Sequence, residues 1–223
     1  MIRETLRTIG RGVGVAVMTG VEVTALSVWL GLVGGVSPLS RAAAVGVAAL
    51  AAGLLVAGLL AHLTANGTGQ PIPALTLGAL AVGETLLWVG WLAAVELSDG
   101  VAGLAGAGAA LAVGLAIRHA IADNAHRGRD PLDSLVRRAT AGFGALEAVG
   151  ATAWLVVVSG VVSIPGWVLP VRIAGFSPSA IVGAALLACA VFVRHLLAVR
   201  HSLRPTRAAT EAGWHSSQTP IRK

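Results

Sequence analysis

The chain has 223 residues, of which 56% are hydrophobic and 12% are charged, and its mean hydropathy is +0.82. Soluble domains carry roughly 25% charged residues, so this composition excludes an ordinary water-soluble fold and indicates an integral membrane protein. The formal net charge of +6 does not indicate nucleic acid as a partner, because the basic residues are not gathered on a soluble domain.

Six apolar stretches follow one another along the chain. Each is close to the roughly 20 residues that a helix needs to cross a ~30 Å hydrocarbon layer. They cover residues 13–36, 42–65, 74–95, 101–122, 139–162 and 179–199. We therefore predict an all-α integral membrane protein whose six transmembrane helices form one domain, 13–200, between a basic N-terminal lead, 1–12, and a basic flexible tail, 201–223.

A glutamate lies in the middle of the first, third and fifth stretches. Glu22, Glu84 and Glu147 are 62 and 63 residues apart, which fits two membrane crossings with their connections. Each is followed seven residues later by a tryptophan, about 10 Å further along a helix. We expect these tryptophans to anchor the helices at the outer headgroup region. They are Trp29, Trp91 and Trp154.

A histidine recurs in the same way near the end of the second, fourth and sixth stretches. His62, His119 and His195 are each followed by alanine three residues later. The two recurrences together predict three tandem two-helix hairpins with pseudo-threefold character. The hairpins cover residues 13–66, 74–124 and 139–200.

The glutamates and histidines are expected to meet inside each hairpin. Helical side chains lean toward their own N-terminus, so an acid on one helix and an imidazole on the antiparallel helix approach each other. A charge at the bilayer centre costs roughly 2.5 to 3.5 kcal/mol, which favours such pairing. The expected pairs are Glu22 with His62, Glu84 with His119, and Glu147 with His195. Arg118 and Arg194, just before two of the histidines, are expected to extend to the inner membrane surface.

The distribution of basic residues predicts the orientation. If the N-terminus is inside, one side receives nearly all of the arginines and the other receives only Arg41 and Arg172. This positive-inside pattern predicts a multi-pass protein of the cell membrane with both termini in the cytoplasm. The basic tail is expected to bind acidic lipid headgroups.

Transport is the leading functional prediction, because buried acids beside imidazoles suit reversible protonation and carboxylate rings favour cations. Glu22, Glu84 and Glu147 would form the ring of a proton or cation transporter or channel. His62, His119 and His195 would form a gate or proton relay near the cytoplasmic mouth. Enzymatic activity is not expected, since H-E-x-x-H, P-loop and G-x-S-x-G patterns do not occur.

Two alternatives remain from the sequence. The chain could be an electron-transfer subunit that binds haem b or quinol through the three histidines, with Arg118 and Arg194 on the propionates, or it could ligate a metal ion. It could also be a structural or assembly subunit, in which the Glu/His pairs only hold the hairpins in register. Stripes of small residues would then form the contact with a second copy or another membrane subunit.

Overall fold

The computed structural model describes residues 2–33, 36–67, 71, 74–168, 170 and 176–202. Within these ranges the chain forms six α-helices and one short 3-10 helix. The helices are α1 (Ile2–Val33), α2 (Arg41–Asn66), α3 (Ala74–Glu96), α4 (Gly100–His126), α5 (Arg138–Val158) and α6 (Pro178–Ser202), with the 3-10 helix at Gly166–Val168. All six α-helices are long and apolar enough to cross a membrane. Most of the predicted tail, 203–223, lies outside the described residues.

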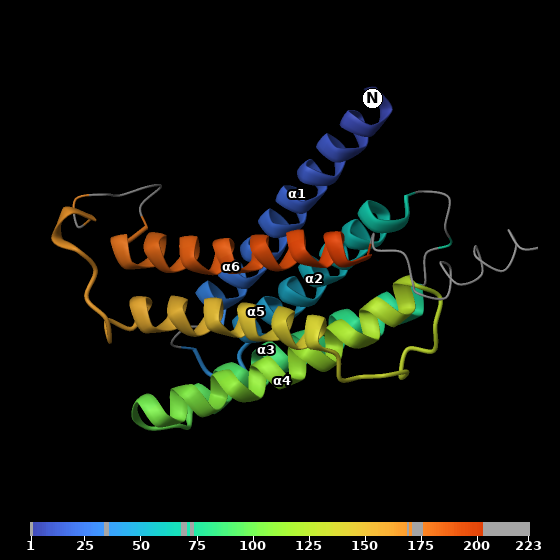
Figure 1. Ribbon diagram of the computed structural model, residues 1–223. Helices are drawn as coiled ribbons and strands as arrows, with labels where there is room; N and C mark the ends of the chain where they lie inside the picture. The colour runs from blue at the N-terminus through green and yellow to red at the C-terminus, as the bar shows by residue number, and fades with distance from the viewer. Residues whose placement is uncertain are drawn as a thin grey trace, which may run out of the picture.

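Local signals in the sequence explain where the helices begin and end. Ser40 caps α2, because its hydroxyl accepts a hydrogen bond from the amide of Ala43 at 3.1 Å. Gly67 follows α2 with φ +71°, a conformation that glycine adopts without strain, and its amide donates to the Leu63 carbonyl at 2.8 Å. Helix α1 begins at Ile2, within the basic lead, and projects beyond its neighbours (Figure 1).

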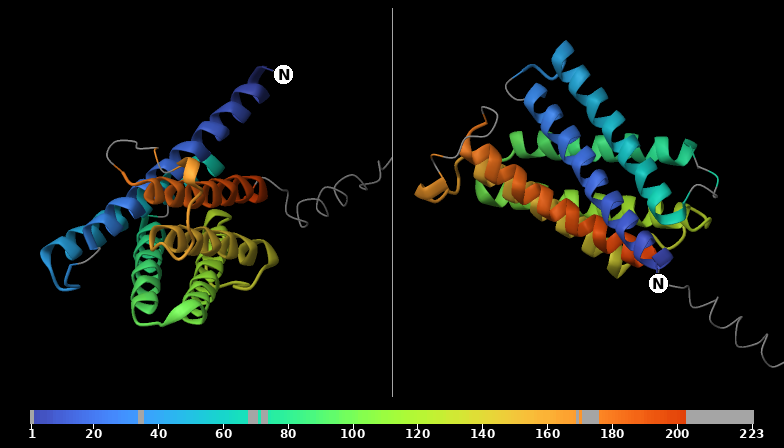
Figure 2. Two further views of the ribbon diagram at one scale, coloured as in Figure 1. Left: turned by 90° about the vertical axis from the view of Figure 1, so that its left-hand side faces the viewer. Right: turned by 90° about the horizontal axis from the view of Figure 1, so that it is seen from above.

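The helices form a closed ring. Each helix packs against the next one along the chain, and α1 also packs against α6, which joins the first helix to the last. The two further views show α6 lying beside α5 from both directions (Figure 2). We name the end at which α2, α4 and α6 finish the histidine end, and the opposite one the far end. Side chains on the inner faces of all six helices can therefore meet at the centre of the ring.

Tryptophan occupies the core of the bundle rather than its rim. Trp29, Trp88 and Trp91 are only 1%, 1% and 3% exposed, and Trp154 is half-buried against the same core. The predicted interface anchoring of Trp29 and Trp91 is therefore wrong. Seven residues are about two helical turns, so each tryptophan faces the same way as its glutamate, toward the centre of the ring.

Glycine brings α4 and α5 into backbone contact. A Cβ atom at Gly144 would lie 2.5 Å from both the Ala112 carbonyl oxygen and the Ala116 amide nitrogen. The backbones of the two helices therefore pack at a distance that only glycine permits at this position.

Asp123 ties the ends of the same two helices together. Its carboxylate accepts hydrogen bonds from Arg127 at 2.8 Å, Arg129 at 3.0 Å and Arg137 at 3.1 Å. Arg127 also donates to the backbone carbonyl of His201 at 3.1 Å, which extends the connection to α6. These contacts join the histidine ends of α4, α5 and α6.

Candidate functional site

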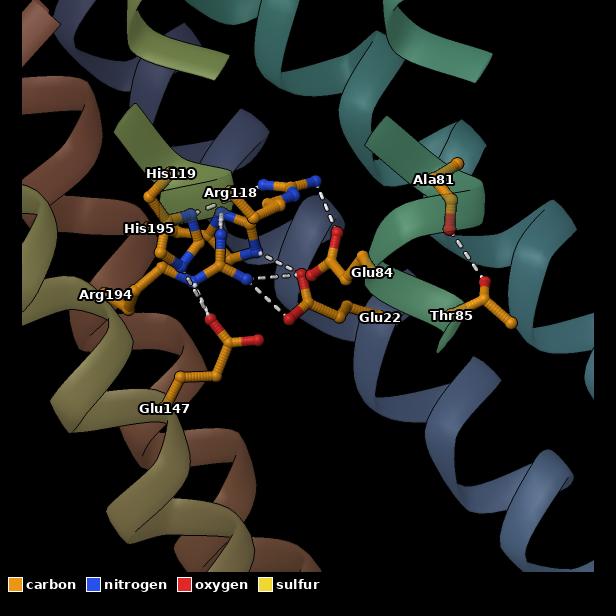
Figure 3. A network of polar contacts seen from close by, with 9 residues as sticks. All are labelled: Glu22, Ala81, Glu84, Thr85, Arg118, His119, Glu147, Arg194 and His195. Atoms are coloured by element: carbon orange, nitrogen blue, oxygen red, sulfur yellow. Dashed lines mark hydrogen bonds and ion pairs between the residues drawn. The ribbon is translucent and has the colours of Figure 1, made fainter. Parts of the chain in front are cut away.

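Seven ionisable side chains meet at the centre of the ring (Figure 3). We call this group the buried ionic cluster. The glutamates of α1, α3 and α5 are 2%, 1% and 0% exposed, and one carboxylate oxygen from each lies within 4.8 Å of the other two. Arginine–histidine pairs reach them from α4 and α6. The members are Glu22, Glu84, Arg118, His119, Glu147, Arg194 and His195.

Arg194 connects two of the three carboxylates. Its Nη2 atom donates to both oxygens of Glu22, at 2.5 and 2.6 Å, while its Nε atom lies 3.1 Å from Glu147 Oε2. His195, the next residue, places Nε2 at 3.1 Å from Glu22 Oε2. Glu22 is thus held by two neighbouring side chains of α6.

The two residues of the arginine–histidine pair of α4 contact different carboxylates, those of Glu84 and Glu147. Arg118 forms an ion pair with Glu84 through Nη2, and His119 places Nε2 at 3.0 Å from Glu147 Oε2. Of the described residues, none forms a hydrogen bond with Glu84 Oε1 or Glu147 Oε1, although both atoms are buried. Two donor atoms of the cluster, Nε of Arg118 and Nε of Arg194, are likewise buried without a hydrogen bond among the described residues.

Hydrogen bonding assigns a neutral tautomer to both histidines of the cluster. Nη1 of Arg118 lies 3.4 Å from Nδ1 of His119, and Nη1 of Arg194 lies 3.3 Å from Nδ1 of His195. A guanidinium group can only donate, so each Nδ1 must be the acceptor and carry no proton. The ring proton then resides on Nε2, which donates it to a glutamate.

With every glutamate ionised, the cluster would carry one more negative charge than positive. With His119 and His195 neutral, three carboxylates face two guanidinium groups. An isolated charge inside a membrane costs several kcal/mol, roughly 2.5 to 3.5 on insertion scales. The surplus charge thus favours the uptake of one positive charge from outside the cluster.

The predicted pairing within each hairpin is wrong. Glu22 pairs with His195 rather than His62, and Glu147 pairs with His119 rather than His195. Glu84 has arginine as its partner instead of histidine. Since the ring closes between α1 and α6, residues from opposite ends of the chain meet, and depth along each helix does not reveal this closure.

The arginines of the cluster also differ from their predicted position. Arg118 and Arg194 do not extend to the membrane surface, because their guanidinium groups turn inward to the glutamates (Figure 3). The signal that could have revealed their role was present in the sequence: three buried acids and few other cations within the same apolar stretches.

His62 lies away from the carboxylates. Its Nδ1 atom is 3.2 Å from the side-chain amide of Asn66, and its ring stands 5.6 Å from that of His126. Asn66 also donates to the backbone carbonyl of His126 at 3.4 Å. These contacts link the histidine ends of α2 and α4, so His62 belongs to a second polar group outside the buried ionic cluster.

A cavity connects the cluster with the histidine end of the bundle. Its volume is about 80 Å³, and four histidines, two arginines and an aspartate contribute to its lining, together with apolar residues. On the opposite side of the cluster the core is apolar, with Trp29, Trp88, Leu54 and Leu115 packed together. A cavity with several ionisable lining residues therefore approaches the cluster from one end, and apolar packing closes the cluster toward the other. The ionisable lining residues of this cavity are His119, His126, His195, His201, Asp123, Arg118 and Arg194.

The contacts of the histidines do not favour haem ligation. His119 and His195 both direct Nε2 to a carboxylate, and Arg118 and Arg194 are engaged with glutamates rather than standing clear for propionates. A larger groove of about 650 Å³ lies between α3 and α4, but its lining is almost entirely apolar apart from Arg118. It suits a hydrocarbon chain better than a polar substrate.

Comparison with family models, curated proteins and solved structures finds no match to this chain.

Proposed function

We propose that this protein is a membrane transporter that moves protons or other small cations by way of the buried ionic cluster. One observation carries the proposal: three buried carboxylates share only two guanidinium groups at the centre of six apolar helices. A purely structural ion-pair network would be more stable with balanced charge, since an uncompensated buried charge is costly. An unbalanced network instead suits the reversible binding of a cation.

The architecture proposed from the sequence supports the same function. Three hairpins arranged around a pseudo-threefold axis would present a glutamate from every first helix to the centre. In support, α1, α3 and α5 each contribute one carboxylate, and these alternate around the ring with α2, α4 and α6.

The cavity at the histidine end and the apolar packing toward the far end support a transporter rather than an open channel. A cation could reach the cluster through the cavity at the histidine end, but the tryptophan and leucine core separates it from the far end. Release on the other side would require the core to open there while the cavity closes. His119 and His195 would relay protons: once the neighbouring arginine releases Nδ1, that atom would take up a proton as Nε2 passes its own to a glutamate.

The histidine end is proposed to face the cytoplasm of a cell. Arg127, Arg129, Arg137 and Arg138 lie at this end, whereas Arg41 is at the far end, which fits the positive-inside rule. Both termini would then be cytoplasmic, and the basic tail would lie near acidic lipid headgroups.

Flux measurements in proteoliposomes test the proposal. The purified protein is reconstituted around a pH-sensitive dye, and uptake is driven by an imposed potential with either protons alone or Na⁺, K⁺ or divalent ions present. We expect flux in the natural protein and its loss when Glu22, Glu84 and Glu147 are all replaced by glutamine.

Two controls accompany this experiment. Asp99→Asn changes an exposed acid at the far end and should leave the flux unchanged. The triple variant leaves two buried arginines without carboxylates and can therefore fail to fold for reasons of charge alone. A five-site variant that also carries Arg118→Gln and Arg194→Gln makes the cluster neutral again. Comparing the two variants separates loss of function from loss of folding. Undiminished flux in either cluster variant would exclude the carboxylates from transport and leave the network a structural role.

A further inference from the structure

The surplus charge of the cluster can be traced to a single position in α2. Arginine stands directly before the histidine in α4 and in α6, at Arg118 and Arg194. The residue directly before His62 in α2 is Ala61. A third arginine at this position would balance the three glutamates, and alanine leaves the cluster one positive charge short.

A small cavity occupies the space beside this alanine. Its volume is about 30 Å³, and Ala57, Gly58 and Ala61 of α2 line it. Glu84 and Glu22 also contribute to its lining. One water molecule needs a cavity of only ~10 to 15 Å³, so the space admits a single water.

Glu84 is the carboxylate best placed to use this space. Glu22 binds Arg194 through both of its oxygens and His195 through one, whereas Glu84 has Arg118 as its single ion-pair partner among the described residues. Its other oxygen, Oε1, is buried without a hydrogen-bond donor. A carboxylate in this setting has an oxygen available for a proton.

We propose that the cluster binds one exchangeable proton on Glu84, next to the cavity at Ala61, and that the proton is the transported cation. This inference rests on the proposed transport function and names its substrate. In the binding step a hydronium ion in the cavity gives up a proton, an O–H bond forms at Glu84, and a water molecule remains. The cluster then carries three positive charges, counting the bound proton, against three carboxylates.

The surroundings of Glu84 favour a proton over a metal ion. Arg118, Arg194, His126 and His195 line the small cavity alongside Glu22, so guanidinium groups would repel a metal cation there. A proton bound covalently to the carboxylate neutralises its negative charge, whereas a metal ion would remain as a separate positive charge beside the arginines. Alkali and alkaline-earth ions also require several oxygen ligands, and the remaining lining residues, all from α2, α3 and α4, are apolar.

Infrared difference spectroscopy tests the proposal without depending on transport. A protonated carboxyl group gives a carbonyl stretching band that moves to lower frequency in deuterium oxide. We expect one such band in the natural protein at neutral pH, a shift of this band in Glu84→Asp, and no shift in Glu147→Asp. Ala61→Arg supplies the missing charge and should abolish both the band and proton flux, whereas Ala61→Met adds similar length without charge and should retain the band.

Glu84→Gln provides a second neutral cluster without added volume, so the test survives if arginine does not fit at position 61. Retention of the band in Glu84→Gln, or its disappearance on adding Na⁺ to the natural protein, would overturn the assignment of a proton to Glu84. A band with the expected shifts but no flux would support proton binding and contradict the transport function instead. Flux of Na⁺ or K⁺ without a carboxyl band would support transport and overturn this inference.

Discussion

Arg194 is the residue with the most contacts inside the cluster, because its guanidinium group reaches both Glu22 and Glu147. Replacing it with glutamine leaves two buried carboxylates without their shared cation. Removing one partner of a buried ion pair costs about 3 to 5 kcal/mol, so we expect a corresponding loss in the free energy of unfolding. The midpoint of unfolding in detergent measures this loss.

Arg200→Gln is the matched control, because Arg200 lies on the same helix and is exposed. Its replacement should change stability by no more than about 0.5 kcal/mol. Equal destabilisation by the two substitutions would contradict the role of Arg194 as the central cation of the cluster.

At the residue scale the sequence predicted which acids are buried, but not what binds them. Glu22, Glu84 and Glu147 stand in the middle of apolar stretches, and each is buried as expected. Their partners depend on how far each helix is rotated about its axis, and one residue of sequence corresponds to about 100° of rotation. Hydropathy averages over this rotation, so the arginines next to the histidines were assigned to the surface although they face the centre.

At the scale of helices, the contact between α4 and α5 depends on Gly144. Gly144→Ala would place a methyl group against backbone atoms of Ala112 and Ala116, which have no rotamer through which to move aside. Overpacking of this kind costs about 1 to 3 kcal/mol, and the same unfolding measurement detects it.

Gly142→Ala, two residues away on α5, offers the comparison. A Cβ atom at Gly142 meets nothing within 4 Å among the described residues. Alanine there should be neutral or should stabilise the helix by up to about 1 kcal/mol. If both alanine variants unfold at the same midpoint, the close packing of α4 on α5 does not contribute to stability as described.

Helix positions were the most predictable feature of the fold. The six predicted spans overlap the six α-helices, because length and hydropathy alone identify a stretch that can cross a membrane. The main difference lies at the N-terminus, where α1 already begins at Ile2. Arginines at positions 3, 7 and 11 lower the hydropathy of this segment, so hydropathy alone places the start of the helix too late. Arginine is nevertheless a good helix former, which is consistent with the earlier start.

At the scale of the whole molecule, the proposed orientation can be tested with two leucines at opposite ends of the bundle. Leu39, at the far end, is 98% exposed, and Leu132, at the histidine end, is 69% exposed. In a Cys189→Ser background, which removes the one cysteine of the sequence, each is replaced by cysteine. On intact cells a membrane-impermeant maleimide should label Leu39→Cys and not Leu132→Cys, because the histidine end is proposed to be cytoplasmic.

Permeabilised cells serve as the control, since both positions should then be labelled equally. Labelling of Leu132→Cys alone on intact cells would reverse the orientation and place the cavity at the histidine end outside the cell.

The closure of the ring between α1 and α6 could not be predicted from the sequence. Nothing in either helix alone specifies the other, and their contact depends on the summed packing of all six helices.

The Asp123 contacts limit how such a bundle could rearrange. Helices α4 and α5 are joined both at their histidine ends and along their length, so they would move together as one rigid unit. The contact of Arg127 with His201 attaches α6 to this unit. Glu22 of α1 is bound to Arg194 and His195 of α6, so any opening between α1 and this half of the bundle would first have to separate that carboxylate from α6.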